Sequence, residues 1–109
     1  NHLGMFANPF DPAEIPAFLE SHPIGDANVD LETRVKSYLD ANCAFCHRPN
    51  GVQGAFDARF PVPMESQSII KQPGISPSSP AGSVIVKPKD PSGSELWVRD
   101  NSLGSNKMP

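Results

Sequence analysis

The sequence predicts a small all-α domain that is rich in loops and has at most a short β element. The two clearest helix start signals lie at Asp30 and at Asp90, and no alternation of strands and helices is visible along the 109 residues. Thirteen prolines and eight glycines interrupt the chain, and hydrophobic residues make up only 38% of it. Such a chain has little apolar surface to bury, so we expect an additional group to complete its core.

Residues 1–29 are predicted to form an N-terminal extension or linker. Asp11 and Pro12 suit the N-cap and first position of a helix that runs to about residue 20. Pro16 interrupts this segment, so we expect one or two helical turns at most. The segment either wraps around the domain that follows or forms the tail of a preceding one.

The clearest helix is predicted over residues 31–41. Asp30 is a good N-cap, and Glu32 adds negative charge to the first turn. Apolar residues recur at every fourth position and are expected to be core residues: Leu31, Val35 and Leu39.

Loops dominate the predicted structure beyond this helix. Residues 48–51 contain Asn-Gly and predict a turn, and the prolines of residues 57–64 predict an extended strip. We expect a short helix over residues 64–71, with Ile69 and Ile70 facing the core, and a loop over residues 74–82.

The C-terminal part is predicted to contain a short β-like run and a second helix. Residues 83–87 form the run, and Asp90 with Pro91 supplies an N-cap and first helical position. The helix should end near residue 99 and pack through three apolar residues: Leu96, Trp97 and Val98. A loop then leads to Met108.

The most informative motif is Cys43-Ala44-Phe45-Cys46-His47, which contains both cysteines and one of the three histidines. The spacing C-x-x-C-H is the attachment signature of a c-type haem. Two thiols three positions apart can add across the two vinyl groups of one porphyrin edge. The histidine that follows is then held where an imidazole nitrogen can ligate the iron. We therefore predict one haem c, covalently bound through Cys43 and Cys46, with His47 as an iron ligand.

Other readings of C-x-x-C are less favoured. A zinc site would need His47 and either His2 or His22 in addition to the two cysteines, and no second paired motif exists. A thioredoxin-like dithiol would follow a strand in a βαβ unit, whereas this motif follows a predicted helix. A disulfide between Cys43 and Cys46 would close a very short loop and would leave the histidine unexplained.

The sixth iron ligand is predicted to be Met108. Met108 lies far downstream in a polar loop and precedes a proline, so core packing does not explain it. The other candidates are Met5, Met64, His2 and His22. A thioether favours ferrous iron and raises the reduction potential relative to two histidines, which would suit a one-electron carrier. The alternative is a haem domain with an open distal site, serving as an enzyme or gas sensor.

Further side chains are candidates for contacts around the haem. The second ring nitrogen of His47 needs an acceptor, and we expect a backbone carbonyl within residues 60–63. Guanidinium forks and an indole N–H suit the haem propionates, so cofactor-binding candidates are Arg48, Arg59, Trp97 and Arg99. The competing interpretations are solvated surface charge for the arginines and core packing for the tryptophan.

Charge and hydropathy exclude several partners. The net charge is −3 without a basic stripe, so nucleic-acid binding is not expected. No apolar run approaches the ~18 residues of a membrane span. The start has no signal-peptide pattern, yet haem attachment to this motif generally takes place outside the cytoplasm. We expect a periplasmic or extracellular bacterial protein whose leader was removed, or a piece of a longer exported chain.

The motifs together resemble a known family. An early C-x-x-C-H with a late Met-Pro resembles the class I cytochrome c domain, a small helical fold around one haem. The segments over residues 31–39, 42–51, 57–60 and 86–99, followed by Met108-Pro109, are similar to monohaem domains near the C-termini of large exported bacterial proteins. The resemblance covers residues 30–109.

The resemblance implies thioether bonds at Cys43 and Cys46 and axial ligation by His47 and Met108. It implies electron transfer to a transient redox partner rather than catalysis, in a domain that can be tethered to a larger oxidoreductase. Such domains normally continue beyond Met-Pro into a C-terminal helix that is absent from this sequence. Either the chain was trimmed, or residues 1–29 supply the missing packing.

Overall fold

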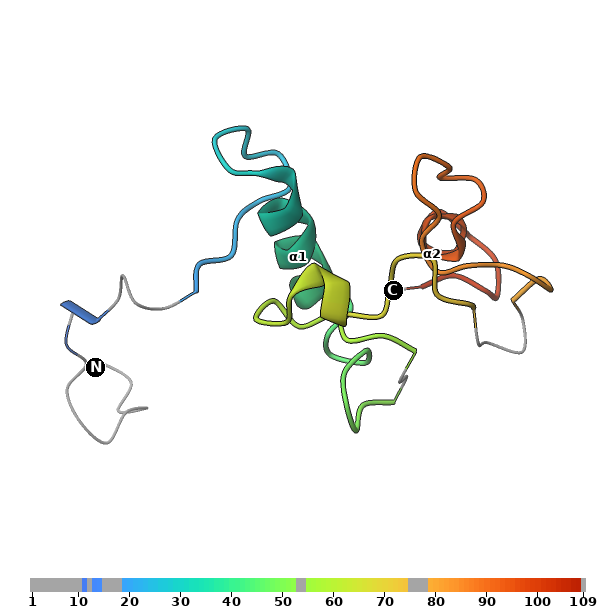
Figure 1. Ribbon diagram of the computed structural model, residues 1–109, viewed down its shortest axis with the longest axis horizontal. Coiled ribbons are helices and arrows are strands. Elements are labelled where there is room, and N and C mark those ends of the chain that lie inside the picture. The colour runs from blue at the N-terminus through green and yellow to red at the C-terminus, as the bar shows by residue number, and fades with distance from the viewer. Residues whose placement is uncertain (1–10, 12, 15–18, 53–54, 75–78, 109) are drawn as a thin grey trace.

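The computed structural model describes residues 11, 13–14, 19–52, 55–74 and 79–108. Within these ranges it contains the α-helix α1 (Leu31–Asn42), the 3₁₀ turn η2 (Met64–Ser66) and the short α-helix α2 (Glu95–Asp100). Loops make up most of the remainder, and the described part of the chain has no strand. The predicted loop-rich, mostly helical class is confirmed at this level (Figure 1).

Helix α1 matches its predicted bounds to within one residue. The Asp30 carboxylate accepts hydrogen bonds from the backbone N–H of Thr33 at 2.9 Å and from its hydroxyl at 2.7 Å. These bonds favour the ionised carboxylate and lower the pKa of Asp30. Leu39 is buried, but Leu31 is 63% exposed, so its predicted core role is wrong. Leu31 occupies the first turn, beyond the reach of the core.

The segment before α1 folds back onto that helix. The backbone N–H of His22 donates to the hydroxyl of Ser37 at 3.0 Å, and the Arg34 guanidinium donates to the Ile24 carbonyl at 2.9 Å. Earlier in the chain, the described residues 13–14 form a 3₁₀ turn after Asp11. The rest of the predicted helix, including Pro12 and Pro16, lies outside the described residues.

The helix predicted over residues 64–71 is wrong except for its first turn, η2. Ser68 and Lys71 have φ angles of 56° and 58°, in the left-handed region that an α-helix cannot contain. The chain is extended between them, so neighbouring side chains point to opposite sides. Ile69 is therefore buried at 3% exposure, while Ile70 is 44% exposed.

Residues 83–87 pair through isolated β-bridges with the segment that follows η2 and with the residue just before α2. Val86 pairs with Ile70, and Val84 pairs with both Pro73 and Ser94. The predicted β-like run therefore makes sheet-like pairs, although no strand forms in the described residues. This pairing fixes the start of α2 against the segment that follows η2.

Helix α2 begins later than predicted, at Glu95 rather than at Pro91. The Asp90 carboxylate accepts from the Gly93 N–H at 2.9 Å and pairs with the Lys87 ammonium at 2.7 Å, so it caps a turn instead. Ser94 is the N-cap residue of α2. The end of the helix at Asp100 lies one residue from the predicted position.

The hydrophobic core is small and lies beside α1. Among the described residues six apolar side chains are buried: Leu39, Ala44, Phe56, Ala58, Ile69 and Ile85. The helices α1 and α2 make no extensive direct contact with each other. No helix in the described ranges is both long and apolar enough to cross a membrane.

Candidate functional site

The cysteine-histidine motif continues directly from the end of α1. The N–H groups of Cys43 and Ala44 both donate to the Leu39 carbonyl, at 2.8 and 3.1 Å. The Cys43 carbonyl then accepts from the N–H groups of Cys46 and His47, at 3.1 and 2.8 Å. The motif thus forms its own tight turn, and its backbone is fixed without any contribution from the thiols. Both cysteines are free thiols.

His47 is almost completely buried, with 6% of its surface exposed. Its ring stacks on Phe56 with 4.1 Å between the centroids and 13° between the planes. Its carbonyl accepts from the Ala58 N–H at 2.9 Å, so backbone and ring are both held. Burial, followed by the positive charge of Arg99, lowers the pKa of His47 and favours the neutral imidazole that a metal ligand requires.

The Nδ1 atom of His47 is buried and has no hydrogen-bond partner in the described part of the protein. The predicted bond to a carbonyl of residues 60–63 is therefore wrong for this atom. One carbonyl of this strip, that of Pro63, accepts from the Ser66 N–H at 2.9 Å. A buried imidazole without a protein partner indicates that a group other than these residues completes its surroundings.

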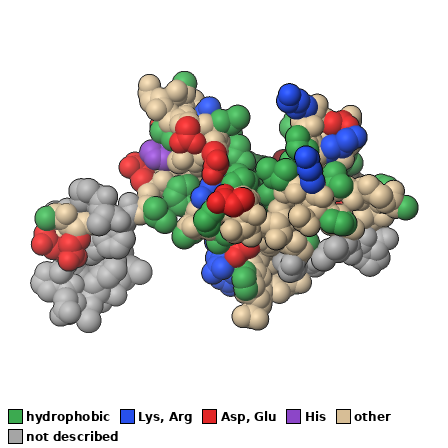
Figure 2. Space-filling view, in the orientation of Figure 1, with side chains coloured by type: hydrophobic (Ala, Val, Ile, Leu, Met, Phe, Trp, Pro, Cys, Tyr) green, Lys and Arg blue, Asp and Glu red, His purple; other side chains and the backbone are tan. Residues whose placement is uncertain are grey.

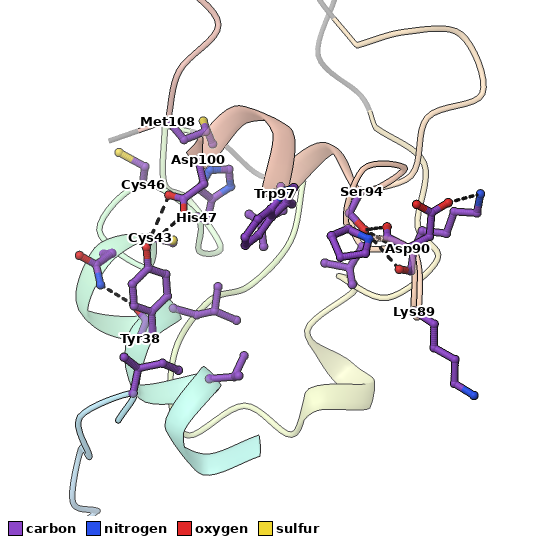
Figure 3. Close-up of a pocket in the computed structure, with 18 residues that line it drawn as sticks. Tyr38, Cys43, Cys46, His47, Lys89, Asp90, Ser94, Trp97, Asp100 and Met108 are labelled. Atoms are coloured by element: carbon purple, nitrogen blue, oxygen red, sulfur yellow. Dashed lines mark hydrogen bonds and ion pairs between the residues drawn. The ribbon is translucent and has the colours of Figure 1, made fainter. Parts of the chain in front are cut away.

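A cavity of about 560 Å³ lies between the motif and α2. This volume is within the range of roughly 300–1,000 Å³ that is usual for ligand and cofactor sites. The cavity is lined by Ile24, Val35, Tyr38, Leu39, Asn42, Cys43, Cys46, His47, Val86, Lys87, Lys89, Asp90, Pro91, Ser94, Leu96, Trp97, Asp100 and Met108 (Figure 3). Figure 2 shows hydrophobic side chains gathered between the region of α1 and the region of α2 on this face of the molecule.

The cavity brings the two ends of the domain together. Cys43, Cys46 and His47 line it from the motif, and Met108 lines it from a position more than sixty residues later in the chain. A hydrogen bond also crosses it, because the Tyr38 hydroxyl on α1 donates to the Asp100 carboxylate on α2 at 3.3 Å (Figure 3).

The other candidate distal ligands are placed differently. Met64 packs against the hydrophobic core and does not line the cavity. His22 lies near Asp26, with 3.7 Å between Nδ1 and the carboxylate, and is also absent from the cavity lining. Met5 and His2 lie outside the described residues. Of the described candidates, Met108 alone shares the cavity with the motif.

The structure does not bring the predicted arginines to the cavity. Arg59 forms a two-pronged pair with Asp57, at 2.9 and 2.7 Å, on the surface. Arg48 lines a separate, smaller hollow of about 190 Å³. Arg99 binds Glu95 and the Asn106 carbonyl, and it also lines a different cavity.

Trp97 does line the cavity and is 54% exposed, so the predicted role of Trp97 as a packed core residue is wrong (Figure 3). The cations that sequence reasoning missed at this site are Lys87 and Lys89. Their position in a turn before α2 gave no signal in the sequence. Tyr38 and Asp100 were also missed as cavity residues, because their proximity depends on the packing of segments distant in sequence.

The Cys43 thiol has a raised pKa, because burial disfavours the thiolate and the charges of Asp100 and Cys46 add to this effect. Cys43 is thus a neutral thiol facing an apolar space. Cys46, three residues later in the motif, lines the same cavity. The two thiols therefore face one largely apolar cavity.

Comparisons with known proteins assign no family to the chain. No family model, curated protein or solved structure matches it.

The structure also tests which kind of group fits the site. In the described ranges no three or more His, Cys, Asp or Glu side chains gather in a way that could hold a metal ion by themselves. The cavity offers instead an imidazole, a thioether and two thiols among apolar walls. This donor set fits an iron that arrives within a large apolar ring, because the ring supplies the remaining ligands.

Proposed function

We propose that this domain transfers single electrons through one covalently attached c-type haem. The observation that carries the proposal is that Cys43, Cys46, His47 and Met108 line one largely apolar cavity. The sequence motif contains three of these residues, and Met108, which the sequence also singled out, lines the same cavity. The small core and the sparse contact between the helices support the proposal, because a large apolar cofactor would complete both.

Each residue has a distinct role in this proposal. The thiols of Cys43 and Cys46 would hold the haem covalently, and the His47 imidazole and Met108 thioether would bind its iron. When bound, the haem supplies reversible one-electron chemistry at its iron. Phe56 holds the plane of the His47 ring by stacking on it. The methionine sulfur would favour the ferrous state and raise the reduction potential.

An exposed aromatic side chain next to the two cysteines suits contact with a redox partner. Phe45, which lies between the two cysteines, is 79% exposed and offers an apolar contact beside the attachment edge. A transient redox partner could dock there through a small interface. Because attachment to this motif takes place outside the cytoplasm, a periplasmic or extracellular location, free or within a larger exported oxidoreductase, is part of the proposal.

The first test is expression with export to a periplasm that contains the haem-attachment machinery. We expect a reduced-minus-oxidised spectrum with c-type bands that persist after denaturation, because the thioether bonds are covalent. The double variant Cys43→Ala/Cys46→Ala should lose this covalent haem. A wild-type protein that lacks c-type bands under these conditions would refute the proposal.

The second test concerns the distal ligand. The variant Met108→Ala should have a lower midpoint potential, and its ferrous form should bind carbon monoxide rapidly, whereas the wild type should bind it slowly. Met64→Ala is the matched control, because Met64 does not line the cavity. Rapid carbon monoxide binding by the wild type would instead favour a haem domain with an open distal site.

A further inference from the structure

The last part of the loop that carries Met108, residues 106–108, is tied to α2 at two points, and both involve Arg99. The backbone N–H of Met108 donates to the Arg99 carbonyl at 3.1 Å. The Nε–H of the Arg99 guanidinium donates to the Asn106 carbonyl, also at 3.1 Å. Two bonds placed two residues apart fix both the position and the direction of the chain where it enters the cavity.

Arg99 is itself held in place by its own helix. Its Nη1 lies 3.3 Å from the Glu95 carboxylate, one helical turn earlier. The Glu95 side chain is only 10% exposed and also accepts hydrogen bonds from the hydroxyls of Ser79 and Ser83. The guanidinium is therefore anchored on one side and available to the loop on the other. A charge-assisted bond of this kind is stronger than one between neutral groups.

Arg99 does not line the cavity that contains the cysteine-histidine motif. Arg99, Glu95 and Asn106 line a second cavity of about 430 Å³ and are absent from the lining of the first. Met108 lines the first cavity and not the second. Arg99 thus lies behind the methionine loop, where it can act on the site through Met108.

We propose that Arg99 is a positioning residue for the distal methionine: it holds residues 101–108 so that the Met108 thioether faces the cavity. This inference rests on the proposed function for the role of the thioether. The hold on the loop itself is independent of that function. The sequence had suggested a propionate contact for Arg99, and the geometry points to this different role.

The hold on the loop is tested by amide hydrogen exchange, read for residues 101–108 by NMR. We expect exchange at Met108 to be on the order of tenfold faster in Arg99→Leu, the factor expected for loss of one charge-assisted hydrogen bond. Arg59→Leu is the matched control, because Arg59 is bound to Asp57 and lies outside the cavity. Unchanged exchange in Arg99→Leu would overturn the proposal.

The variant Arg99→Lys separates charge from geometry. Lysine keeps the positive charge near Glu95 but has no Nε–H in the guanidinium position that reaches the Asn106 carbonyl. We expect Arg99→Lys to follow Arg99→Leu in the exchange measurement. Wild-type exchange in the lysine variant would show that the hydrogen bond does not position the loop.

Carbon monoxide association with the ferrous protein tests action through the methionine. Arg99→Leu should bind carbon monoxide on the order of tenfold faster than the wild type, because the loop releases the thioether more often. In the Met108→Ala background the same substitution should leave this rate unchanged. An equal acceleration of carbon monoxide binding in both backgrounds would show that Arg99 does not act through Met108.

The two proposals fail in different ways. If the protein carries no covalent haem, the proposed function fails, and the exchange measurement still decides whether Arg99 holds the loop. If haem is present and Met108→Ala behaves as expected while Arg99→Leu matches the wild type, the proposed function stands and the positioning role is refuted.

Discussion

Replacing Phe56 by leucine tests whether the stacked pair with His47 stabilises the domain. Phe56 is 6% exposed and lies 4.1 Å, centroid to centroid, from the imidazole. Loss of the aromatic pair costs ~0.5–1.5 kcal/mol. The smaller leucine also leaves unfilled space in the core, which costs on the order of another 1 kcal/mol. We expect the free energy of unfolding to fall by about 2 kcal/mol, a large part of the stability of a small domain.

The assay is urea unfolding of the full chain, followed by circular dichroism, with wild type and variant matched for haem content. A loss of this size should lower the urea midpoint by about 1 M. Phe45→Leu makes the same chemical change at a side chain that is 79% exposed, and we expect its effect to stay within about 0.5 kcal/mol. Equal effects of the two substitutions would refute the assignment of Phe56 as the support of the imidazole.

Two further predictions concern the turn after the motif and the surface ion pair. A Cβ at Gly51 would collide with the Cys46 carbonyl, so Gly51→Ala should destabilise the protein by ~1–3 kcal/mol in urea unfolding. Gly25→Ala, with open space around the new Cβ, should be nearly neutral. The hydrogen bond from Arg59 lowers the pKa of Asp57 below its ordinary value. Since the folded-state pKa is the lower one, the contribution of Asp57 to stability is complete above the unfolded-state pKa and is lost as pH falls through the folded-state value. The wild type should therefore exceed Asp57→Asn in stability near neutral pH, and the difference should vanish in strong acid; a constant difference across this range would contradict the assignment.

Local signals in the sequence predicted the parts of the fold that depend on neighbouring residues. Helix α1 follows from Asp30 and the apolar spacing, because a cap and a periodic face act within a few residues. The turn after the motif follows from Asn50, which has a φ of 62°, a conformation that asparagine tolerates well. These elements need no distant partner.

The predicted elements that failed were those that distant contacts decide. The segment after Met64 has apolar residues suited to a helix, but pairing with Val86 draws it into an extended path. Asp90 suits an N-cap, yet its carboxylate binds Lys87 and Gly93, and Ser94 is the N-cap residue of the helix instead. Local propensity differs little between such alternatives, so a few tertiary hydrogen bonds determine the outcome.

The same division applies to the candidate site. The sequence by itself determined the motif of Cys43, Cys46 and His47, because its chemistry requires those residue types at a fixed spacing along one turn. Only the tertiary structure decided which distant side chains face that motif. It placed Met108 at the cavity and Arg99 behind the methionine loop, through bonds that join the chain end to α2. Spacing within a turn is a local property of the chain, whereas the opposite wall of a cavity depends on how the whole chain packs.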